Sequence, residues 1–363
     1  MLYNWQQKDW PQFQYDLKRI EEDLFLFTEK SGLVAGLLRG LPDRDRDEAI
    51  ADILAIEAIH NSTIEGEVLS RPDVISSVRN QLGLNQEPAP VRDRASIGAA
   101  ELAVSVREDW DATLTEDLLF EWHAKLLQGE RSLIVGGWRT HETPMQVITP
   151  HVRSPIVHFE APPSFRVPDE MSRFIQWFNR SRSEMIHAPI RSALTHLYFE
   201  SVHPFEDGNG RIGRALSEKA LSEGLGRPVL LSLSRAVEQD RDSYYEALKR
   251  AQKSNETTEW IRYFLHIILQ AQIATETQVE FVLKKARFFE RFRDQMNPRQ
   301  QKAINRVFQE GPEGFRGGLN ARKYKNLTEV SKATATRDLQ DLVKKGSLVP
   351  TGAGRSARYE INL

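Results

Sequence analysis

The chain has 363 residues, which is long for one domain, and its 49 Lys and Arg against 51 Asp and Glu give a formal net charge of −2. Hydrophobic residues make up 40 % and charged residues 28 %, values typical of a globular protein with a buried core. The absence of cysteine excludes disulfide bonds, thiolate nucleophiles and cysteine-ligated zinc. No segment approaches the roughly 20 apolar residues of a membrane span, and the aromatic, polar N-terminus is unlike a signal peptide. We therefore expect a soluble, cytoplasmic protein with no membrane partner.

The charge is divided unevenly along the chain. From Phe281 to the C-terminus there are 18 Lys and Arg against 8 Asp and Glu, whereas the preceding residues carry 31 against 43. An acidic body with a basic C-terminal segment predicts that the two parts meet different partners. A solvated basic face that binds nothing would give the same count.

The N-terminal region, residues 1–90, reads as helical. Small and β-branched apolar residues recur at helical spacing from Ala49 to Ile59, behind an acidic run that suits the first turn of a helix. Gly66 is a natural end for this helix. The Pro- and Gln-rich stretch 85–93 reads as a linker to a central domain at 91–280.

The central region is mostly helical but contains one different segment. Between Gly136 and Pro168, glycines, prolines and the short runs MQVI and IVHF predict a β-hairpin or irregular flap. Amphipathic helices resume with VPDEMSRFIQWFNR and APIRSALTHLYFESV.

The C-terminal segment, residues 281–363, has its own pattern. Three short helices are predicted, the first with Asn297 as N-cap and the third with Ser331 as N-cap and Gly346 beyond its end. SLVPT and ARYEINL then read as a two-stranded wing. This order is typical of a winged helix-turn-helix, which places its third helix in a DNA major groove, although such modules also serve in protein interaction and dimerisation.

The stretch HPFEDGNGRIGR, positions 203–214, carries the strongest chemical signal. Pro204 disfavours helical geometry at His203, so a helix should end there. The turn Gly208-Asn209-Gly210 lets backbone N–H groups converge on an anion, and the helix expected to follow points its positive dipole end at that turn. Arg211 and Arg214 share one face of that helix. Together these features predict a phosphate site.

Asp207 within this stretch is repulsive to phosphate unless a cation lies between them, and Mg²⁺ commonly bridges a carboxylate and substrate phosphates. His203 is a candidate general base, because histidine's ordinary pKa of about 6.5 suits proton removal near neutral pH.

Two other interpretations stay open at this point. Each element of the stretch alone is compatible with an ordinary turn and surface ion pairs. Glu57-x-x-His60 and Glu200-x-x-His203 also repeat the ligand pair of di-iron helical bundles, but Pro204 opposes the regular helix that this needs. Isolated histidines such as His123 and His196 read as ordinary core or surface residues.

HPFEDGNGRIGR resembles, residue for residue, the active-site motif of the Fic family, His-x-Phe-x-Asp/Glu-Gly-Asn-Gly-Arg-x-x-Arg. GGWRT followed by MQVITP resembles the family's target-docking flap, and the aromatic N-terminus is similar to the leader of bacterial Fic proteins with a C-terminal winged helix. The resemblance covers nearly the whole chain and is tightest from about 136 to 252. It implies a mainly α fold: a helical Fic core with a short β-hairpin flap, a helical N-terminal region and the winged helix-turn-helix.

The resemblance implies transfer of AMP from ATP to a Ser, Thr or Tyr hydroxyl of a target protein. His203 would deprotonate the hydroxyl, and Asp207 would hold Mg²⁺. The flap would pair with the target as an added strand through Gln146, Val147, Ile148 and Thr149. The positions matching the family's nucleotide-binding residues are Gly208, Asn209, Gly210, Arg211, Ile212, Gly213, Arg214, Tyr244, Tyr245 and Gln252.

NSTIEGE, positions 61–67, resembles the end of the family's inhibitory helix, Ser/Thr-x-x-x-Glu-Gly/Asn, with Asn61 in place of Ser or Thr. Glu65 falls at a helix C-terminus, where the dipole disfavours an anion by about 0.3–1 kcal/mol, so a solvated position or a partner cation is expected. The resemblance supplies Arg214 as that cation, withdrawn from the γ-phosphate.

The sequence thus predicts a self-restrained protein adenylyltransferase whose target is unknown and includes the chain itself as a candidate. The alternatives are a nucleotide-sensing regulator that binds DNA, removal of AMP by the same site, and transfer of another phosphate-linked group. A homo-oligomer is a further candidate state.

Overall fold

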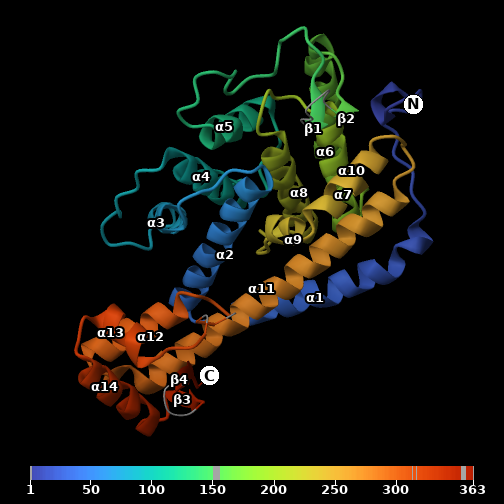
Figure 1. Ribbon diagram of the computed structural model, residues 1–363. Helices are drawn as coiled ribbons and strands as arrows, with labels where there is room; N and C mark the ends of the chain where they lie inside the picture. The colour runs from blue at the N-terminus through green and yellow to red at the C-terminus, as the bar shows by residue number, and fades with distance from the viewer. Residues whose placement is uncertain (1, 150–155, 313, 316, 353–356, 363) are drawn as a thin grey trace. The chain divides into compact units, whose positions relative to one another are not determined.

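The computed structural model describes residues 2–149, 156–312, 314–315, 317–352 and 357–362. The chain divides into two compact units, one of residues 1–33 and 50–275 and the other of residues 34–49 and 276–363. Both are mostly helical, and the strands form two small two-stranded sheets, so the predicted mainly α fold is confirmed (Figure 1). Within the described residues, no helix combines the length and the apolar character that crossing a membrane requires.

The N-terminal part of the chain forms helices joined by short connections. α2 begins within an acidic run and ends at Ile64, and Gly66 follows with φ of +84°, as the sequence predicts. Residues 85–93 form an irregular connection between α3 and α4, whose apolar faces pack on α2. The helices of this part are α1 (Glu21–Arg39), α2 (Asp43–Ile64), α3 (Arg71–Gln81) and α4 (Arg94–Glu108), with short 3₁₀ turns at Asn4–Gln6 and Leu17–Arg19.

Two buried helices, α7 and α8, carry the 203–214 stretch between them in the first unit (Figure 1). Their side chains are buried on nearly every face, and Ser192 on α7 donates a hydrogen bond to the Ser217 carbonyl on α8. Because both helices are enclosed, their ends are held rigidly by the surrounding core. α7 spans Ala188–Val202 and α8 spans Asn209–Leu225. The other helices of this part of the chain are α5 (Glu116–Leu126), α6 (Val167–Glu184), α9 (Leu233–Gln239), α10 (Arg241–Ala251) and α11 (Thr258–Phe292).

The predicted hairpin is present. β1 (Gln146–Thr149) pairs antiparallel with β2 (Ile156–Glu160), with an irregularity between Val147 and Ile148. The N-terminal segment supports this hairpin, because the Trp5 indole donates a hydrogen bond of 2.8 Å to the Glu160 carbonyl and packs against Phe159.

The second unit contains the predicted order of three helices and a hairpin. These elements are α12 (Pro298–Phe308), α13 (Ala321–Thr328), α14 (Lys332–Lys344), β3 (Leu348–Thr351) and β4 (Arg358–Ile361). The Asn297 side chain caps α12, the Ser331 hydroxyl caps α14, and Gly346 follows α14 with φ of +76°. Its designation as a winged helix-turn-helix stays a prediction.

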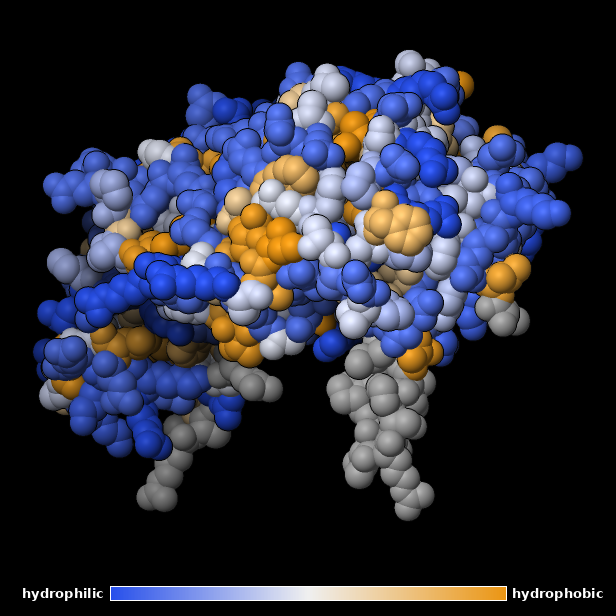
Figure 2. Space-filling model, turned by 90° about the horizontal axis from the view of Figure 1, so that it is seen from above, coloured by the Kyte–Doolittle hydropathy of each residue, from blue (hydrophilic) through white to orange (hydrophobic). Residues whose placement is uncertain are grey.

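Hydrophobic side chains are largely withdrawn from the surface. Figure 2 shows one face covered mainly by hydrophilic residues, with hydrophobic residues in small separate groups. The largest interior clusters of the first unit surround α7 and α8, which places the 203–214 stretch against the core and not on a free loop.

Candidate active site

His203 caps the C-terminus of α7 in the left-handed conformation, with φ of 50° and ψ of 61°. Its N–H still donates to the Phe199 carbonyl at 2.9 Å, and Pro204 prevents the helix from continuing. Left-handed geometry is costly for a residue with a Cβ, so surrounding contacts must hold it. Arg139 provides them: its Nε donates to the His203 carbonyl at 2.8 Å and its Nη2 to the Val202 carbonyl at 3.3 Å.

The turn that follows is closed by Asn209. Its side-chain oxygen accepts from the Phe205 N–H at 2.9 Å, and its amide donates to the Phe205 carbonyl at 2.9 Å. His123 supports the same turn, because its ring stacks on Phe205 at 3.9 Å and its Nε2 lies 3.1 Å from the Asp207 carbonyl oxygen. Both polar atoms of the Asn209 side chain are thus engaged within the loop. Its predicted contact with phosphate stays a prediction.

Two glycines allow close approach at the start of α8. A Cβ on Gly210 would lie 2.2 Å from Oε1 of Glu65, and one on Gly213 would lie 2.8 Å from Oε1 of Glu200. Gly208, with φ of +82°, precedes α8 in the left-handed region. The glycines therefore admit two carboxylates beside a helix N-terminus.

The Arg214 guanidinium is almost fully buried and meets the end of α2. Its Nη2 lies 2.7 Å from Glu65 Oε1, its Nε donates to Asn61 Oδ1 at 2.6 Å, and Nη2 also donates to the Asn61 carbonyl at 3.1 Å. Burial alone would lower the pKa of Arg214, but the charge of Glu65 outweighs it and holds the pKa above its ordinary value. Asn61 thus supplies acceptors to the arginine at the position where the sequence pattern departs from Ser or Thr.

Arg211 is also paired, but with different acids. Its Nη1 lies 2.7 Å from Glu67 Oε2, and its Nη2 lies 3.2 Å from Asp207 Oδ2. Asp207 additionally accepts the Gly208 N–H at 2.6 Å. Both arginines of the stretch therefore face carboxylates from the segment that follows α2. The pairing of Glu67 was not predicted from the sequence.

The Asp207 carboxylate fits Mg²⁺. Its side chain is 53 % exposed, and it adjoins the turn at the N-terminus of α8. An accessible carboxylate at an anion-binding turn is the ligand that Mg²⁺ uses together with substrate phosphates. No cluster of three or more His, Cys, Asp and Glu side chains able to hold a metal occurs in the part of the chain that the structure describes.

The predicted nucleotide residues outside the loop divide into buried and partly open positions. Tyr244 is buried, and its hydroxyl lies 2.6 Å from His196 Nε2. The Tyr245 ring, 5.1 Å from that of Tyr244, is partly open, and burial raises the pKa of both phenols. The buried Gln252 amide donates to the Glu200 carbonyl at 3.2 Å.

Ile212 packs in the core, and its N–H bonds the Gly208 carbonyl. Its contact with ATP stays a prediction, as do those of Tyr244, Tyr245 and Gln252.

The hairpin has a strand edge that no other described strand covers. β1 pairs with β2 alone among the described residues, and the Gln146 amide donates to the Glu160 carboxylate at 2.8 Å. Val147 and Phe159 are paired across the two strands. The backbone of Ile148 and Thr149 belongs to β1. Target docking by the β1 residues Gln146 to Thr149 stays a prediction.

Several supporting residues were missed by sequence reasoning. His123 and His196, read as ordinary residues, contact the active-site stretch or its Tyr244 neighbour, and Glu200 lies 3.4 Å from His203. Arg139 is 1 % exposed, and burial lowers its pKa to about 10. Its only sequence signal is its position in GGWRT.

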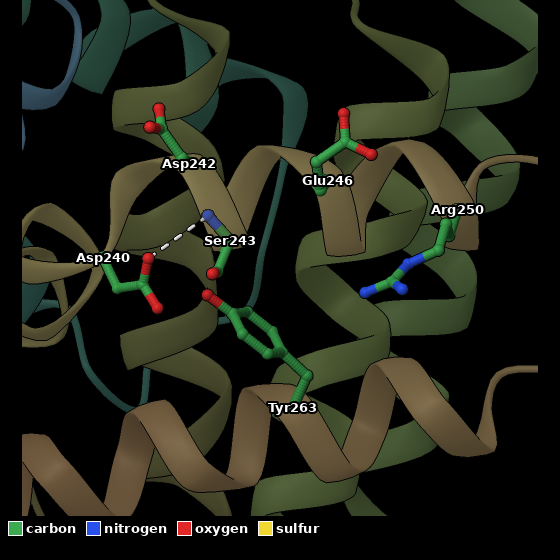
Figure 3. Close-up of a pocket in the computed structure, with 6 residues that line it drawn as sticks. All are labelled: Asp240, Asp242, Ser243, Glu246, Arg250 and Tyr263. Atoms are coloured by element: carbon green, nitrogen blue, oxygen red, sulfur yellow. Dashed lines mark hydrogen bonds between the residues drawn. The ribbon is translucent and has the colours of Figure 1, made fainter.

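A separate cavity of about 390 Å³ lies between α10 and α11 (Figure 3). It is lined by Asp240 before α10, by the α10 side chains Asp242, Ser243, Glu246 and Arg250, and by Tyr263 of α11. Asp240 accepts a hydrogen bond from the Ser243 N–H. None of the residues of the 203–214 stretch lines this cavity.

Comparison with known proteins identifies the class. The model of the Fic/DOC family matches residues 113–221, and a model described as Domain of unknown function (DUF4172) matches residues 3–84. Protein adenylyltransferase Fic from Nematostella vectensis is 26 % identical over 198 residues, covering 53 % of this chain and 41 % of the relative. Protein adenylyltransferase Fic from Drosophila melanogaster is 35 % identical over 98 residues, covering 27 % and 18 %. The chain therefore matches less than half the length of either relative.

A crystal structure of a Fic family protein from Desulfovibrio desulfuricans G20 shares the fold, with a TM-score of 0.52, 20 % identity, and coverage of 94 % of this chain and 96 % of that one. A helical core that holds the His-Pro-Phe-Glu-Asp-Gly-Asn-Gly-Arg loop between two packed helices is a Fic domain. Residues 113–221 of the chain therefore form a Fic domain.

Proposed function

We propose that the protein transfers AMP from ATP to a Ser, Thr or Tyr hydroxyl of a target protein, and that Glu65 restrains this activity. One observation carries the proposal: His203 is fixed at the end of α7 while Arg211 and Arg214 lie on the first turns of α8, directly after the glycine turn. A base and a cationic phosphate site are thus held at the two sides of one short loop. The relatives named protein adenylyltransferase support the same reading.

In the proposed reaction the target hydroxyl oxygen forms a bond to the α-phosphorus of ATP. The bond from that phosphorus to the oxygen bridging to the β-phosphorus breaks, and pyrophosphate leaves. Nε2 of His203 takes the hydroxyl proton, a role that is typically worth on the order of 10²–10⁴-fold. The N–H groups at the start of α8 and the arginines hold the phosphates, because a helix N-terminus favours anions. Asp207 would hold Mg²⁺, which when bound neutralises charge on the phosphates.

The ion pair of Glu65 with Arg214 supports the restraint. Two of the three guanidinium nitrogens of Arg214, Nη2 and Nε, are held by Glu65 and Asn61 and are thereby withdrawn from a γ-phosphate. The bond is charge-assisted and the arginine is buried, which makes this contact stronger than a surface ion pair. A displaced Glu65 would free the arginine for bidentate phosphate contact.

Incubation of the purified full chain with α-labelled ATP and Mg²⁺ tests the proposal. Wild type and Glu65→Gly are compared, each with lysate proteins and alone, and modified residues are located by mass spectrometry. We expect AMP on Ser, Thr or Tyr side chains, and more modified protein with Glu65→Gly than with wild type. Absence of any nucleotide adduct with both proteins would contradict transfer. Label transferred from γ-labelled ATP would indicate a phosphate donor reaction, and loss of AMP from a pre-modified protein would indicate removal.

A second candidate function is DNA binding by α14, which we propose on its surface charge. Lys332 and Arg337 lie exposed on this helix. The acids of the same helix are engaged elsewhere: Asp338 pairs with Arg299 and accepts from the Tyr324 hydroxyl, and Asp341 pairs with Lys345. The exposed N-terminal half of α14 is therefore cationic, as contact with a phosphate backbone requires.

Fluorescence anisotropy with a random 30-base-pair duplex and with genomic fragments tests this candidate. Affinity should fall linearly on a logarithmic salt scale, with a slope of about −0.9 for each neutralised phosphate. Arg337→Ala should make the slope less steep by about the amount that one phosphate contact contributes. Lys344→Ala, at the far end of α14, is the matched control and should leave the slope unchanged. Binding that is absent, or equal at 50 and 200 mM salt, would instead favour protein interaction.

A further inference from the structure

Glu200 lies beneath His203, one turn earlier on α7. It is 5 % exposed, and its Oε2 lies 3.4 Å from Nδ1 of His203. Among the described residues its Oε1 has no hydrogen-bond partner. A buried carboxylate normally has its acceptors satisfied, so an incompletely paired one beside a candidate base calls for an explanation in function.

We propose that Glu200 is a positioning residue for His203: its carboxylate accepts the proton on Nδ1 and so leaves Nε2 unprotonated toward the target hydroxyl. A neutral imidazole carries its proton on one nitrogen only, and the hydrogen bond made by one nitrogen decides the state of the other. The inference rests on the proposed transfer of AMP, because it assigns His203 the role of base.

The contact distance suits this role. At 3.4 Å the pair is longer than a full hydrogen bond, and such catalytic contacts tighten when substrate is bound. Among the residues that the structure describes, the other hydrogen bonds of His203 are to its backbone, from Arg139 to its carbonyl and from its N–H to the Phe199 carbonyl. The ring therefore needs a partner of its own to be fixed in orientation, and Glu200 is the side chain placed to supply it.

The groups around Glu200 lower the pKa of its carboxyl group. Burial alone would raise the pKa of Glu200, but its contact with His203 and the charges of His196 and Arg214 outweigh burial and lower the pKa. Arg214 lies on α8, and its other neighbours there and on α2 and α10 include Glu65 and Tyr244. An ionised carboxylate is a strong acceptor, which the proposed tautomer requires.

Gly213 makes room for this arrangement. A Cβ at this position would lie 2.8 Å from Oε1 of Glu200 and 3.2 Å from Nδ1 of His196. His196 in turn is fixed by the Tyr244 hydroxyl at 2.6 Å on its Nε2. The carboxylate is thus confined between α7 and α8, with His203 as the group placed to donate to it.

Two substitutions separate the carboxylate's functions. Glu200→Gln keeps a hydrogen-bond acceptor but removes the negative charge. Glu200→Met keeps a side chain of similar length but removes the acceptor and the charge. The matched control is Glu218→Gln, which alters a glutamate 6 % exposed on α8 whose charged neighbours are Glu57 and Arg107. Circular dichroism melting of each variant establishes that it is folded.

The direct readout is ¹⁵N NMR of the full chain labelled at its histidines, with the His203 signals assigned from the spectrum of His203→Ala. Above neutral pH we expect the Nδ1–H tautomer in wild type and in Glu218→Gln, a reduced preference in Glu200→Gln, and loss of the preference in Glu200→Met. In the Glu65→Gly background, kcat should fall about 10–100-fold in Glu200→Met with KM for ATP unchanged, and less in Glu200→Gln.

Two results with a folded Glu200→Met variant overturn the proposal. One is the wild-type tautomer at His203, and the other is a kcat within about twofold of its parent. If Met prevents folding, the same criteria apply to Glu200→Gln on the tautomer preference alone. Failure of the proposed AMP transfer looks different: wild type and Glu65→Gly would then form no adduct, while the NMR result still decides whether Glu200 sets the tautomer of His203.

Discussion

The loop at 203–214 and the C-terminal helices use charged side chains in opposite ways. Around the loop, Arg139 and Arg214 are each 1 % exposed and Glu200 is 5 % exposed. On α14, Lys332 and Arg337 are exposed, and Arg299, which pairs with an acid of that helix, has a side chain 46 % exposed. Three charged side chains around the loop are thus enclosed, whereas two cationic side chains of α14 are displayed.

The difference follows from what each region would bind. A buried charge is expensive unless every neighbour is placed to satisfy it, so enclosing several of them fixes their geometry. Fixed donors can act on a few atoms of a phosphate or a hydroxyl. Charged side chains that are exposed and screened by solvent are not fixed in position, but they attract an extended surface of opposite charge. Buried charge therefore marks the catalytic candidate, and displayed charge marks the surface that we propose for DNA.

The largest expected effect is at His203. His203→Ala should lower AMP transfer by about 10²–10⁴-fold and leave Mg·ATP affinity largely unchanged, because the base acts on the target hydroxyl and not on the phosphates. Transfer is measured in the Glu65→Gly background and ATP binding by calorimetry. A variant that keeps most of its transfer rate would remove His203 from the mechanism.

The next effect concerns the ion pair of the buried Arg214 with Glu65, whose side chain is 29 % exposed. Glu65→Gly should increase transfer, including self-modification, by roughly 10–100-fold, since a charge-assisted bond of about 1.5–3 kcal/mol no longer competes with phosphate. Transfer is measured at saturating Mg·ATP with labelled nucleotide.

Glu65→Gln is the control for helix loosening, because it removes the charge but keeps the shape. Adding Arg214→Ala to Glu65→Gly should abolish the gain. If neither Glu65 variant exceeds wild type, the restraint does not reside in this contact.

A smaller gain is expected from the second pair, Glu67 with Arg211. The Glu67 side chain is 42 % exposed, so solvent screens the pair even though Arg211 is buried. Partly exposed ion pairs contribute about 0.2–1 kcal/mol, so Glu67→Gln should raise transfer by at most about fivefold. The same labelling assay compares it with Glu65→Gln. A gain equal to that of Glu65→Gln would mean that exposure does not rank the two contacts.

The sequence predicted what local rules decide. Pro204 after His203 ends a helix, Gly66 follows another, and Asn297 and Ser331 cap two more, all in agreement with the structure. The hairpin at β1 and β2 also follows from composition and short β-prone runs. The roles assigned to the 203–214 residues came from the resemblance to the Fic family and stay proposals.

The supporting contacts could not be predicted, because they join residues far apart in the chain. Arg139 meets the His203 carbonyl across 64 positions, and His123 meets the Asp207 carbonyl across 84. A lone arginine or histidine carries no signal of such a partner. Glu200 read as half of a possible metal pair, and only the packing of α7 on α8 shows that its carboxylate is enclosed against His203.

The smallest effect is on stability, where the two regions should respond to pH with opposite signs. Burial, and then the charge of Glu57, raise the pKa of Glu218 on α8 well above 4.5. A carboxyl group whose pKa is higher in the folded chain than in the unfolded chain adds stability. That stability is complete at a pH below the unfolded-state pKa and is lost as the pH rises through the folded-state pKa. Glu218→Gln keeps a neutral side chain, so its free energy of unfolding relative to wild type should rise between pH 5 and 8.

On α14, hydrogen bonds from Lys345 and Gln300 lower the pKa of Asp341 below 3.8. The stability that this lowered pKa contributes is present above the unfolded-state pKa of Asp341 and is lost as the pH falls through the folded-state pKa. Asp341→Asn should therefore cost stability at neutral pH and progressively less below pH 3.8. Urea unfolding of the two variants and wild type across pH 3–8 measures both trends. Parallel curves for Glu218→Gln and wild type would mean that α8 holds this carboxylate ionised, and that enclosure on that helix does not change its charge state.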